Sequence, residues 1–352
     1  MSAMKSVQTR PGGVEVVEAE RPAAGPRDAL VRIRACGICG TDVTFVHMGG
    51  MPKVLGPQVK AEALSAENMR PVVLGHEPAG EVVEVGAEVT GLRVGDHVVI
   101  NPQGAPSGII GCGGPLGGMS EYLLVQDAEV GKSVAVVPDS LPFEVAALNE
   151  PMAVSRHAVN RSGAGQGDKA IVFGAGPIGL GAAIWLKLLG VHVVVADVIP
   201  SRLETALAVG VDAVIDSSTE DVTARLAELH GEGRNALGAP RPDTDVYIDA
   251  AGVAAVVNTA LASGKWGAKL VTVAVHKKPE PIDLGSILRS EMTIIGSQGY
   301  PTEIFEITPE LVENADRFAR LISHRIPFAE VDKAFELTLT PGAAEKVVVT
   351  YE

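Results

Sequence analysis

The segment Lys169–Gly179, KAIVFGAGPIG, is the strongest indication of fold in this chain. An apolar run typical of a buried strand leads directly into a glycine turn and the start of a helix. In this GxGxxG pattern the first glycine permits the turn, the second lets the backbone approach a pyrophosphate, and the third lets the helix pack on the sheet. The helix N-terminus adds a positive dipole end, so the segment predicts a dinucleotide site. The predicted binding residues are Gly174, Gly176, Pro177, Ile178 and Gly179.

Asp197 ends the next apolar run, VHVVVAD. A carboxylate at this place can accept hydrogen bonds from the ribose hydroxyls of a dinucleotide and would repel a 2′-phosphate. We therefore expect NAD rather than NADP, although Arg202 nearby weakens this preference and joins the predicted cofactor-binding residues. The structural alternative is that Asp197 begins a loop and caps a helix that starts near Pro200.

Six apolar runs follow one another from residue 168 onward, and helical patterns separate most of them. This alternation indicates βαβ units, and six strands complete a doubly wound parallel sheet of the α/β class, the Rossmann fold. The predicted strands are Lys169–Gly174, Val191–Asp197, Ala213–Asp216, Thr244–Ala250, Ala268–Val275 and Met292–Ser297.

The chain before this region has a different pattern. Short strands separated by glycine and proline between residues 14 and 127 predict a small all-β barrel or sandwich. After Gly296, two helical patterns and the strand EKVVVTY follow, and we expect this tail to rejoin the all-β domain. A length of 352 residues agrees with two domains rather than one core.

The composition excludes several classes of protein. A net charge of -14 disfavours nucleic acid as a partner, because phosphate backbones are bound by Lys and Arg. Three cysteines do not make a paired disulfide framework, and the first residues lack the pattern of a secretory signal. The uncharged stretch Ala170–Leu186 is interrupted by glycines and Pro177, which favours a buried strand and helix over a membrane span. We therefore expect a cytoplasmic protein with no nucleic-acid or membrane partner.

Two cysteines, Cys36 and Cys39, stand in the stretch ACGICGTD. Such a CxxC pair can be a redox dithiol, half of a structural zinc site, or a pair in which one thiolate works alone. Downstream, LGHEPAG supplies His76 and Glu77, and LNEPMAV supplies Glu150. One thiolate, one imidazole and one or two carboxylates suit a catalytic Zn²⁺, which keeps three protein ligands and an open position.

These motifs carry a resemblance that runs essentially from end to end. GICGTD, LGHEPAGEVVEVG, NEPMAV and FGAGPIG, in this order, resemble the zinc-dependent medium-chain alcohol dehydrogenase family. The long segment between Cys39 and His76, with VAVHKKP and MTIIGSQGY, is most similar to butanediol and sorbitol dehydrogenases. The resemblance implies a GroES-like catalytic domain at 1–155, an NAD-binding Rossmann domain at 156–296, and a C-terminal part of the catalytic domain at 297–352.

The resemblance also implies the zinc ligands. Cys39 and His76 are completed by a water and by Glu77 or Glu150, which are also catalytic candidates; which glutamate binds stays open. Cys36 is then a small buried side chain. Many relatives hold a second, structural zinc with four cysteines in the loop that corresponds to residues 101–118. That loop has only Cys112 here, so we expect one zinc ion and no structural zinc.

Further roles follow from the resemblance. Thr41 matches the hydroxyl that takes the proton of the alcohol, although it is also suited to cap a helix. Many relatives end the proton relay at a histidine where this chain has Thr44, and the nearest imidazole is His47, so the end of the relay stays open. Lys346 matches a basic position that contacts the cofactor pyrophosphate, and a solvated lysine is the alternative.

The resulting prediction is an NAD- and zinc-dependent dehydrogenase that converts a secondary alcohol, vicinal diol or polyol reversibly to the ketone. The alternatives are a threonine-type amino-alcohol dehydrogenase and a non-catalytic dinucleotide-binding protein, since fold does not entail chemistry. Which alcohol is used stays open. We expect a homodimer or homotetramer, because the edge strand MTIIGS can pair across a twofold axis.

Overall fold

The computed structural model describes residues 3–53, 68–340 and 342–352, and the chain forms two compact units. The first consists of Met1–Glu150, Thr308–Ala315 and Ile322–Glu352, and the second of Pro151–Ile307 and Asp316–Leu321. The sequence predicts three segments, 1–155, 156–296 and 297–352, whereas the two units divide the chain into five. The first segment of the first unit ends at Glu150, and residues 297–307 belong to the second unit.

The second unit is built on a six-stranded parallel sheet with the order β12-β11-β10-β15-β16-β17. Its strands are β10 (Lys169–Phe173), β11 (His192–Asp197), β12 (Ala213–Asp216), β15 (Val246–Asp249), β16 (Lys269–Thr272) and β17 (Thr293–Gly296). The strand order reverses between β10 and β15, which is the topological switch point of a doubly wound fold. The six predicted strands and the predicted fold class are therefore confirmed.

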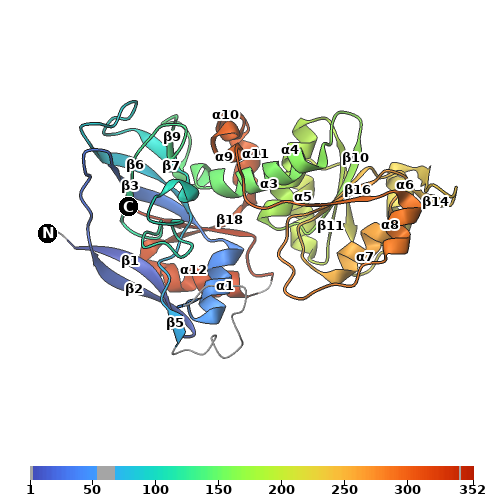
Figure 1. Ribbon diagram of the computed structural model, residues 1–352, viewed down its shortest axis with the longest axis horizontal. Helices are drawn as coiled ribbons and strands as arrows, with labels where there is room; N and C mark the ends of the chain where they lie inside the picture. The colour runs from blue at the N-terminus through green and yellow to red at the C-terminus, as the bar shows by residue number, and fades with distance from the viewer. Residues whose placement is uncertain (1–2, 54–67, 341) are drawn as a thin grey trace. The chain divides into compact units, whose positions relative to one another are not determined.

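The helices between these strands are α4 (Pro177–Leu188), α5 (Pro200–Ala208), α6 (Val222–His230), α7 (Ala254–Ser263) and α8 (Leu284–Ser290) (Figure 1). The chain also forms α3 (Asn149–Ser162) before β10, and α9 (Glu303–Glu306), α11 (Ala315–Phe318) and the 3-10 turn η4 (Ala319–Leu321) after β17. α4 packs on β10 and β11, α5 on β11 and β12, and α7 on β15. This cover buries the strands, which explains why they lack polar alternation. None of the helices in the described ranges has the length and apolarity that crossing a bilayer requires.

A short hairpin between α6 and β15 has no counterpart among the predicted strands. In it β13 (Glu232–Arg234) pairs antiparallel with β14 (Pro240–Pro242). The two strands are three residues long and carry charged and proline side chains. They therefore lack the apolar alternation by which a strand is recognised in sequence.

The first unit is an all-β region with few helices. Its strands before the second unit are β1 (Ala3–Arg10), β2 (Gly13–Glu20), β3 (Ala29–Gly37), β4 (Met51–Pro52), β5 (Met69–Arg70), β6 (Glu77–Val85), β7 (His97–Ile100), β8 (Tyr122–Val125) and β9 (Val134–Val137), with α1 (Gly40–Met48), η3 (Pro102–Gly104) and α2 (Phe143–Ala146). The main sheet has the order β18-β19-β3-β6-β7-β9, with β8 paired to β3. The sequence prediction found β2, β3, β6, β7 and β8. It missed β1, which is rich in polar residues, the two-residue strands β4 and β5, and β9.

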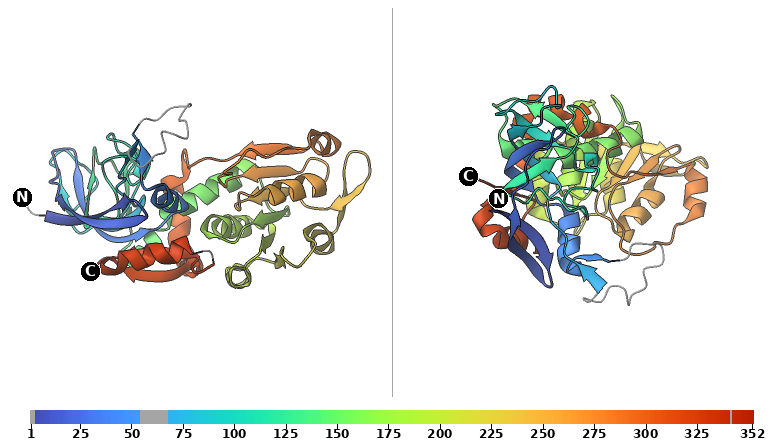
Figure 2. Two further views of the ribbon diagram at one scale, coloured as in Figure 1. Left: turned by 90° about the horizontal axis from the view of Figure 1, so that it is seen from below. Right: turned by 60° about the vertical axis from the view of Figure 1, so that its left-hand side comes forward.

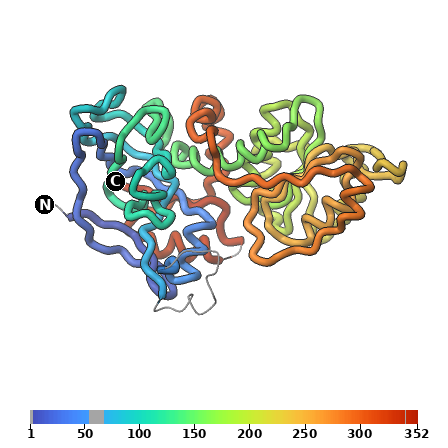
Figure 3. The backbone as a smooth tube through the Cα atoms, viewed as in Figure 1, coloured from blue at the N-terminus to red at the C-terminus, as the bar shows by residue number. Residues whose placement is uncertain are grey.

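The carboxyl-terminal tail completes this sheet. It contains α10 (Thr308–Glu313), β18 (Ile322–Pro327), η5 (Phe328–Glu330), α12 (Val331–Leu339) and β19 (Lys346–Thr350). β19 pairs antiparallel with β3, with Val349 opposite Cys36. α12 lies against β2 (Figure 2), and the red end of the trace returns among the blue strands (Figure 3). The tail thereby brings Lys346 close to the segment that leads to Cys39.

Candidate functional site

Cys39 lies at the N-cap of α1, directly after strand β3. Its backbone is extended, with φ −99° and ψ 158°, and its N–H donates to Asp42 Oδ2 at 2.9 Å. Because Asp42 occupies the third helical position, it closes the helix N-terminus as in a capping box. This local fold fixes the half-buried thiol of Cys39 at the end of the strand.

His76 and Glu77 follow a turn at Gly75, where φ is +91°. A Cβ at Gly75 would meet Met119 N at 2.5 Å and Cys36 Sγ at 2.8 Å, so the turn needs glycine for space as well as for conformation. The chain then enters β6, whose first residue is Glu77. Both His76 and Glu77 are buried.

The structure brings Cys39, His76 and Glu77 together. Their ligand atoms, one sulfur, one ring nitrogen and one carboxylate oxygen, all lie within 4.8 Å of one another. Within the described ranges, His76 Nδ1 and Glu77 Oε1 are buried and have no hydrogen-bond partner. Buried polar atoms are normally satisfied, so the orphaned Glu77 oxygen suggests a missing partner. A thiolate, an imidazole and a carboxylate are a donor set that fits Zn²⁺.

The other oxygen of Glu77, Oε2, forms a buried ion pair with Lys346 Nζ. Glu77 is 1% exposed and Lys346 is 2% exposed, and the ammonium also donates to the Ile38 carbonyl at 3.0 Å. A Cβ at Gly37 would lie 3.0 Å from Lys346 Cε, so the pair fills the space that glycine leaves. Lys346 is therefore not a solvated surface lysine. Its ammonium is buried against a candidate metal ligand, and its contact with a cofactor stays a prediction.

The cluster favours positive charge. Burial alone lowers the pKa of His76, but the nearby Asp42, Cys39 and Glu150 raise it more, and the net pKa lies well above the ordinary value. Burial likewise lowers the pKa of Lys346, yet the surrounding anions raise it above its ordinary value. Opposite charges at close range stabilise the cationic forms of both groups. The same negative charges would stabilise a divalent cation.

Asp42 is a functional candidate that sequence reasoning missed. It is fully buried, its Oδ1 accepts from Gly75 N at 3.2 Å, and that oxygen lies 3.7 Å from His76 Nδ1. Burial raises the pKa of its carboxyl group, and His76 and the N–H groups of Cys39 and Gly75 offset part of the rise. A carboxylate behind a metal-binding imidazole fixes the orientation of the ring. The available signal was an acidic residue three positions after Cys39, at the capping-box position.

Glu150 and the other cysteines lie around this group. Glu150 is buried in the first turn of α3, and its charge acts on His76, but it is not among the three residues whose ligand atoms converge. Cys36 is fully buried, and burial raises the pKa of its thiol well above the ordinary value, as expected for a small core side chain. Cys112 is half-buried, and burial raises its thiol pKa as well.

The candidate relay residues lie along α1. Thr41 is half-buried in the first turn, two residues after Cys39. Because Cys39 is the N-cap, Thr41 does not cap this helix. Thr44 is exposed and donates its hydroxyl to the Gly40 carbonyl at 2.9 Å, and His47 is exposed in the last turn. Neither side chain belongs to the group of converging ligand atoms, so the residue that ends the relay stays open.

The glycine turn of the second unit has the geometry that the motif predicts. Gly174 has φ +93°, and a Cβ there would meet Ala250 backbone atoms at 3.1 Å. A Cβ at Gly179 would collide with the Gly174 carbonyl oxygen, so the close approach of α4 requires glycine. Gly176 is the N-cap of α4, with Pro177 at the first helical position. No described atom lies within 4 Å of a Cβ at Gly176, so the backbone there is open to a ligand.

Asp197 ties this turn to the next strand. It ends β11 and is buried. Its Oδ2 accepts from Ala175 N at 2.6 Å, and its Oδ1 accepts from Val198 N at 2.7 Å and Ile199 N at 2.9 Å. The N-cap of α5 is Ile199, so Asp197 does not cap that helix. Oδ2 accepts only one of these hydrogen bonds and keeps lone-pair capacity for a ribose hydroxyl, whereas Oδ1 already accepts two. Arg202 follows half-buried in α5.

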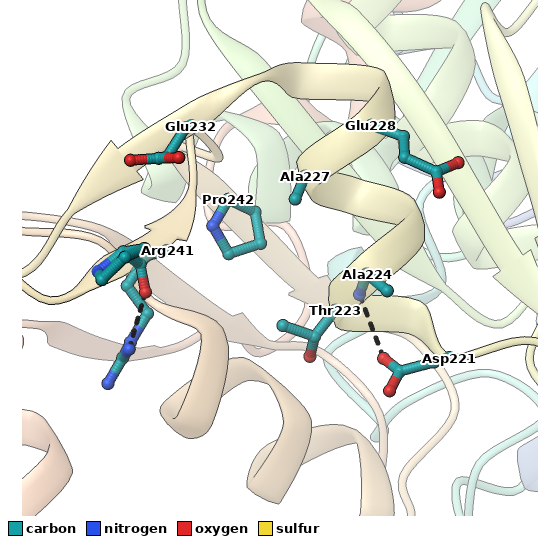
Figure 4. Close-up of a pocket in the computed structure, with 9 residues that line it drawn as sticks. Asp221, Thr223, Ala224, Ala227, Glu228, Glu232, Arg241 and Pro242 are labelled. Carbon is teal, nitrogen blue, oxygen red and sulfur yellow. Dashed lines mark hydrogen bonds between the residues drawn. The ribbon is translucent and has the colours of Figure 1, made fainter.

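A surface hollow of about 540 Å³ lies in the second unit between α6 and the β13-β14 hairpin (Figure 4). Asp221, Glu228 and Glu232 line it together with Arg241 and neighbouring alanine, threonine and proline side chains. Asp221 Oδ1 accepts from Ala224 N, which makes it the N-cap of α6. The hollow contains none of the predicted site residues.

Two family models match the chain. The model for alcohol dehydrogenase GroES-like domains matches residues 25–139, within the first unit. The model for zinc-binding dehydrogenases matches residues 177–316, which cover most of the second unit. The two matches therefore divide the chain much as the compact units do.

Curated relatives are similar over nearly the whole length. The chain is 33% identical over 351 residues to (R,R)-butanediol dehydrogenase of Bacillus subtilis (strain 168), covering 96% of each chain. It is 30% identical to sorbitol dehydrogenase of Homo sapiens, covering 96% of this chain and 93% of the relative. It is 27% identical to L-threonine 3-dehydrogenase of Proteus mirabilis (strain HI4320), covering 100% of each.

Solved structures of dehydrogenases are also similar to the chain over nearly its whole length. The 2R,3R-butanediol dehydrogenase from Bacillus subtilis superposes with a TM-score of 0.81 at 30% identity, covering 99% of each chain. A putative zinc-binding dehydrogenase from Sinorhizobium meliloti 1021, bound to NADP, has a TM-score of 0.81 at 28% identity, covering 99% of this chain and all of the other. A short chain alcohol dehydrogenase from E. coli CFT073, complexed with NADH, has a TM-score of 0.79 at 25% identity with the same coverage.

Proposed function

Because this chain belongs to the zinc-dependent medium-chain alcohol dehydrogenase family, we propose that it oxidises a secondary alcohol, vicinal diol or polyol with NAD. In the balanced reaction the alcohol loses a hydride to NAD⁺ and a proton to solvent, giving the ketone, NADH and H⁺. The observation that carries the proposal is the convergence of Cys39, His76 and Glu77 within 4.8 Å.

These three side chains would hold one catalytic zinc ion, with Glu77 as the third ligand rather than Glu150. When bound, zinc supplies a Lewis acid that lowers the pKa of the substrate hydroxyl, and NAD supplies the hydride acceptor. The proposal for Glu77 rests on its unpartnered buried Oε1, beside the ligand atoms of Cys39 and His76. Glu150 is buried nearby and would add a second carboxylate beside the zinc site, without binding the ion directly.

The residues around the ligands have supporting tasks. Asp42 would hold the imidazole of His76, and Lys346 would hold Glu77 through its Oε2. Thr41 would take the alcohol proton, since its hydroxyl lies in the helical turn that begins at Cys39. The further path of the proton, through Thr44 or His47, is not assigned.

For the dinucleotide we propose NAD, bound at the glycine turn of Gly174, Gly176 and Gly179. The carboxylate of Asp197 at the end of β11 supports this choice, because it would accept from a ribose hydroxyl and repel a 2′-phosphate. Arg202 opposes it in part. Structural relatives hold NADH in one case and NADP in another, so the cofactor has to be measured on this chain.

The substrate class rests on the relatives. Butanediol and sorbitol dehydrogenases are similar to this chain over almost their whole length, and both are named for alcohols with several hydroxyl groups. The similarity to an L-threonine 3-dehydrogenase keeps an amino-alcohol as the second candidate. The third hypothesis is a non-catalytic dinucleotide-binding protein, which would bind no zinc and would turn over no substrate.

The experiment is an assay of NADH formation by the zinc-loaded chain with secondary alcohols, vicinal diols, polyols and L-threonine, and with NADP for comparison. We expect turnover of a diol or polyol with NAD and about one zinc per chain. Cys39→Ser should lose both zinc and turnover, whereas Cys112→Ser, a half-buried thiol in the same unit, should keep both. A wild type that binds no zinc when zinc is supplied and turns over nothing on the whole panel would overturn the proposal.

We also propose a homo-oligomer, either dimer or tetramer. β17 is an edge strand of the parallel sheet, and its Thr293 and Ile294 are exposed. An unpaired edge with an exposed apolar residue is suited to pair with a second copy of the chain. Light scattering should give a mass above the monomer for wild type and a lower mass for Ile294→Lys. A reducing compartment such as the cytoplasm fits the free thiol of Cys39.

A further inference from the structure

In the second unit, β10, β15 and β16 are neighbours in the parallel sheet, and the segments that follow their carboxyl ends lie side by side. They are the glycine turn after β10, the loop Asp249–Gly252 that ends β15, and the segment Val273–His276 after β16. The Ala250 N–H donates to the Phe173 carbonyl at 2.9 Å. The three segments therefore form one edge, on both sides of the point where the strand order reverses.

Asp249 connects these segments through its carboxylate, which is fully buried. Its Oδ1 accepts from Ala251 N at 3.0 Å and from Gly252 N at 2.9 Å, and so shapes the loop of its own strand. Its Oδ2 lies 2.7 Å from Nε2 of His276, which comes from the neighbouring segment. One side chain thus holds two adjacent loops at the same edge of the sheet.

The backbone around this pair is tightly packed. The Asp249 carbonyl accepts from Val273 N at 3.0 Å and from Ala274 N at 3.1 Å. A Cβ at Gly252 would lie 2.9 Å from the Val275 carbonyl oxygen, so the two loops are in direct contact. The ring of His276 is the outermost member: its side chain is 20% exposed. Loss of the ring would therefore remove the side-chain contact that holds the end of this segment at His276, while the backbone hydrogen bonds of Val273 and Ala274 remain.

The direction of the bound dinucleotide follows from the proposed function, on which this inference rests. Asp197, at the end of β11, would receive the adenosine ribose, and the turn after β10 would receive the pyrophosphate. A dinucleotide that crosses the switch point must then extend over the ends of β15 and β16. The nicotinamide half would lie against the loops that Asp249 and His276 hold together.

We propose that His276 is a positioning residue for the nicotinamide half of the cofactor. By binding Asp249 Oδ2 it fixes the segment after β16 against the loop after β15, and so pre-forms one wall of the cofactor site. The role requires a hydrogen-bond donor at the position of Nε2, not an imidazole as such. Pre-formed sites bind more tightly because less chain has to be ordered on binding.

The test uses the zinc-loaded wild type and three substitutions of one residue. His276→Ala removes the donor, His276→Asn carries an amide too short to reach Asp249, and His276→Gln places an amide N–H near the position of Nε2. Lys277→Ala is the matched control, because it changes the exposed neighbour and leaves the pair intact. The dissociation constants of NADH and of ADP, which lacks the nicotinamide half, are measured for each by titration calorimetry.

We expect NADH to bind about tenfold more weakly to His276→Ala and His276→Asn, since a hydrogen bond to a charged partner is lost. His276→Gln should recover most of the affinity, and Lys277→Ala should match wild type. ADP should bind all five proteins alike, because the adenosine half lies on the other side of the switch point. The KM for NAD should rise with the NADH constant, with a smaller change in kcat.

Two results would overturn the role of His276: unchanged NADH affinity in both His276→Ala and His276→Asn, or an equal loss of NADH and ADP affinity, which general damage to the sheet edge would cause. If one of these variants does not fold, the other and His276→Gln still decide the question. A wild type that binds neither NADH nor ADP would instead refute the proposed function, so the two failures are distinguishable.

Discussion

The candidate site of the first unit is built from side chains, whereas that of the second unit is built mainly from backbone groups. In the first unit, the carboxyl groups of Asp42 and Glu77 and the thiol of Cys39 lie close to the imidazole of His76 and the buried ammonium of Lys346. In the second unit, the glycine turn offers backbone N–H groups at a helix N-terminus, and its glycines remove side chains from the path of the ligand.

The two sites should therefore respond differently to mutation. A backbone turn depends on conformation and space, so it fails when a Cβ is added. A buried charge cluster depends on the balance of its members, so it fails when one partner is removed. We therefore expect metal binding and adenosine-half binding to be separable by mutation.

The largest effect should come from removing zinc. Chelation should lower kcat/KM by about 10³-fold or more, because the Lewis acid contributes several kcal/mol to the transition state. The affinity for ADP should be unchanged, since the glycine turn and Asp197 contain no metal ligand. Readdition of zinc is the control and should restore turnover. Loss of ADP binding on chelation would show that the two sites are not separable.

The next effect concerns the buried ion pair of Lys346 and Glu77. In the metal-free protein, Lys346→Met should lower the free energy of unfolding by about 3 kcal/mol, because Glu77 is left buried without a counter-charge. Zinc should reduce this loss by supplying the charge. Lys333→Met, in the exposed pair with Glu330 at 3.2 Å, should cost less than about 1 kcal/mol. Urea unfolding with and without chelator measures both, and equal losses would contradict burial of the pair.

A smaller effect is expected from Gly179→Ala. The added Cβ would collide with the Gly174 carbonyl, so the turn or α4 has to shift at a cost of about 2 kcal/mol. The affinity for ADP should fall by at least about tenfold at unchanged zinc content. Gly165→Ala is the control in the same unit, because its Cβ would meet no atom within 4 Å. Wild-type ADP affinity in Gly179→Ala would show that the turn tolerates a side chain.

The last effect, similar in size to that of Gly179→Ala, is a pH dependence in the second unit, away from both sites. Burial, with the nearby charges of His192 and Lys169, lowers the pKa of His230 to about 4 from an ordinary value of 6.5. Between these values the unfolded chain binds a proton that the folded chain does not. The free energy of unfolding should therefore fall by about 2 kcal/mol as the pH drops from 6.5 to 4.

His230→Asn is the control for this dependence, because its amide can replace the ring nitrogen that lies 2.7 Å from Thr244 Oγ1. In this variant the unfolding free energy should vary less between pH 6.5 and 4. The same pH slope in wild type and His230→Asn would assign the dependence to other groups.

The sequence predicts the second unit better than the first for a physical reason. The strand β10, the glycine turn and the start of α4 are contiguous in the chain, so one short motif specifies strand, turn and helix together. Cys39 is far from the adjacent His76 and Glu77 in the chain, and only the residue types and the family resemblance indicated that the three would converge. The ligand atoms do converge in the structure.

What the sequence could not indicate depends on tertiary packing. Lys346 lies in the last strand, and nothing near it in the chain shows that β19 pairs with β3 and buries its ammonium against Glu77. The β13-β14 hairpin lacks an apolar pattern. Asp42 was overlooked because a capping residue and a carboxylate beside a histidine look the same in sequence; this side chain accepts from the Cys39 N–H and lies 3.7 Å from His76 Nδ1.

The most direct test is X-ray absorption at the zinc edge of the purified wild type. If one thiolate, one imidazole and one carboxylate hold the ion, the spectrum should contain a single sulfur at about 2.3 Å and nitrogen or oxygen neighbours near 2.0–2.1 Å. Cys39→Ser should lose the sulfur signal or the zinc itself. A zinc ion without a sulfur neighbour, or one surrounded by sulfur alone, would contradict a site built from Cys39, His76 and Glu77.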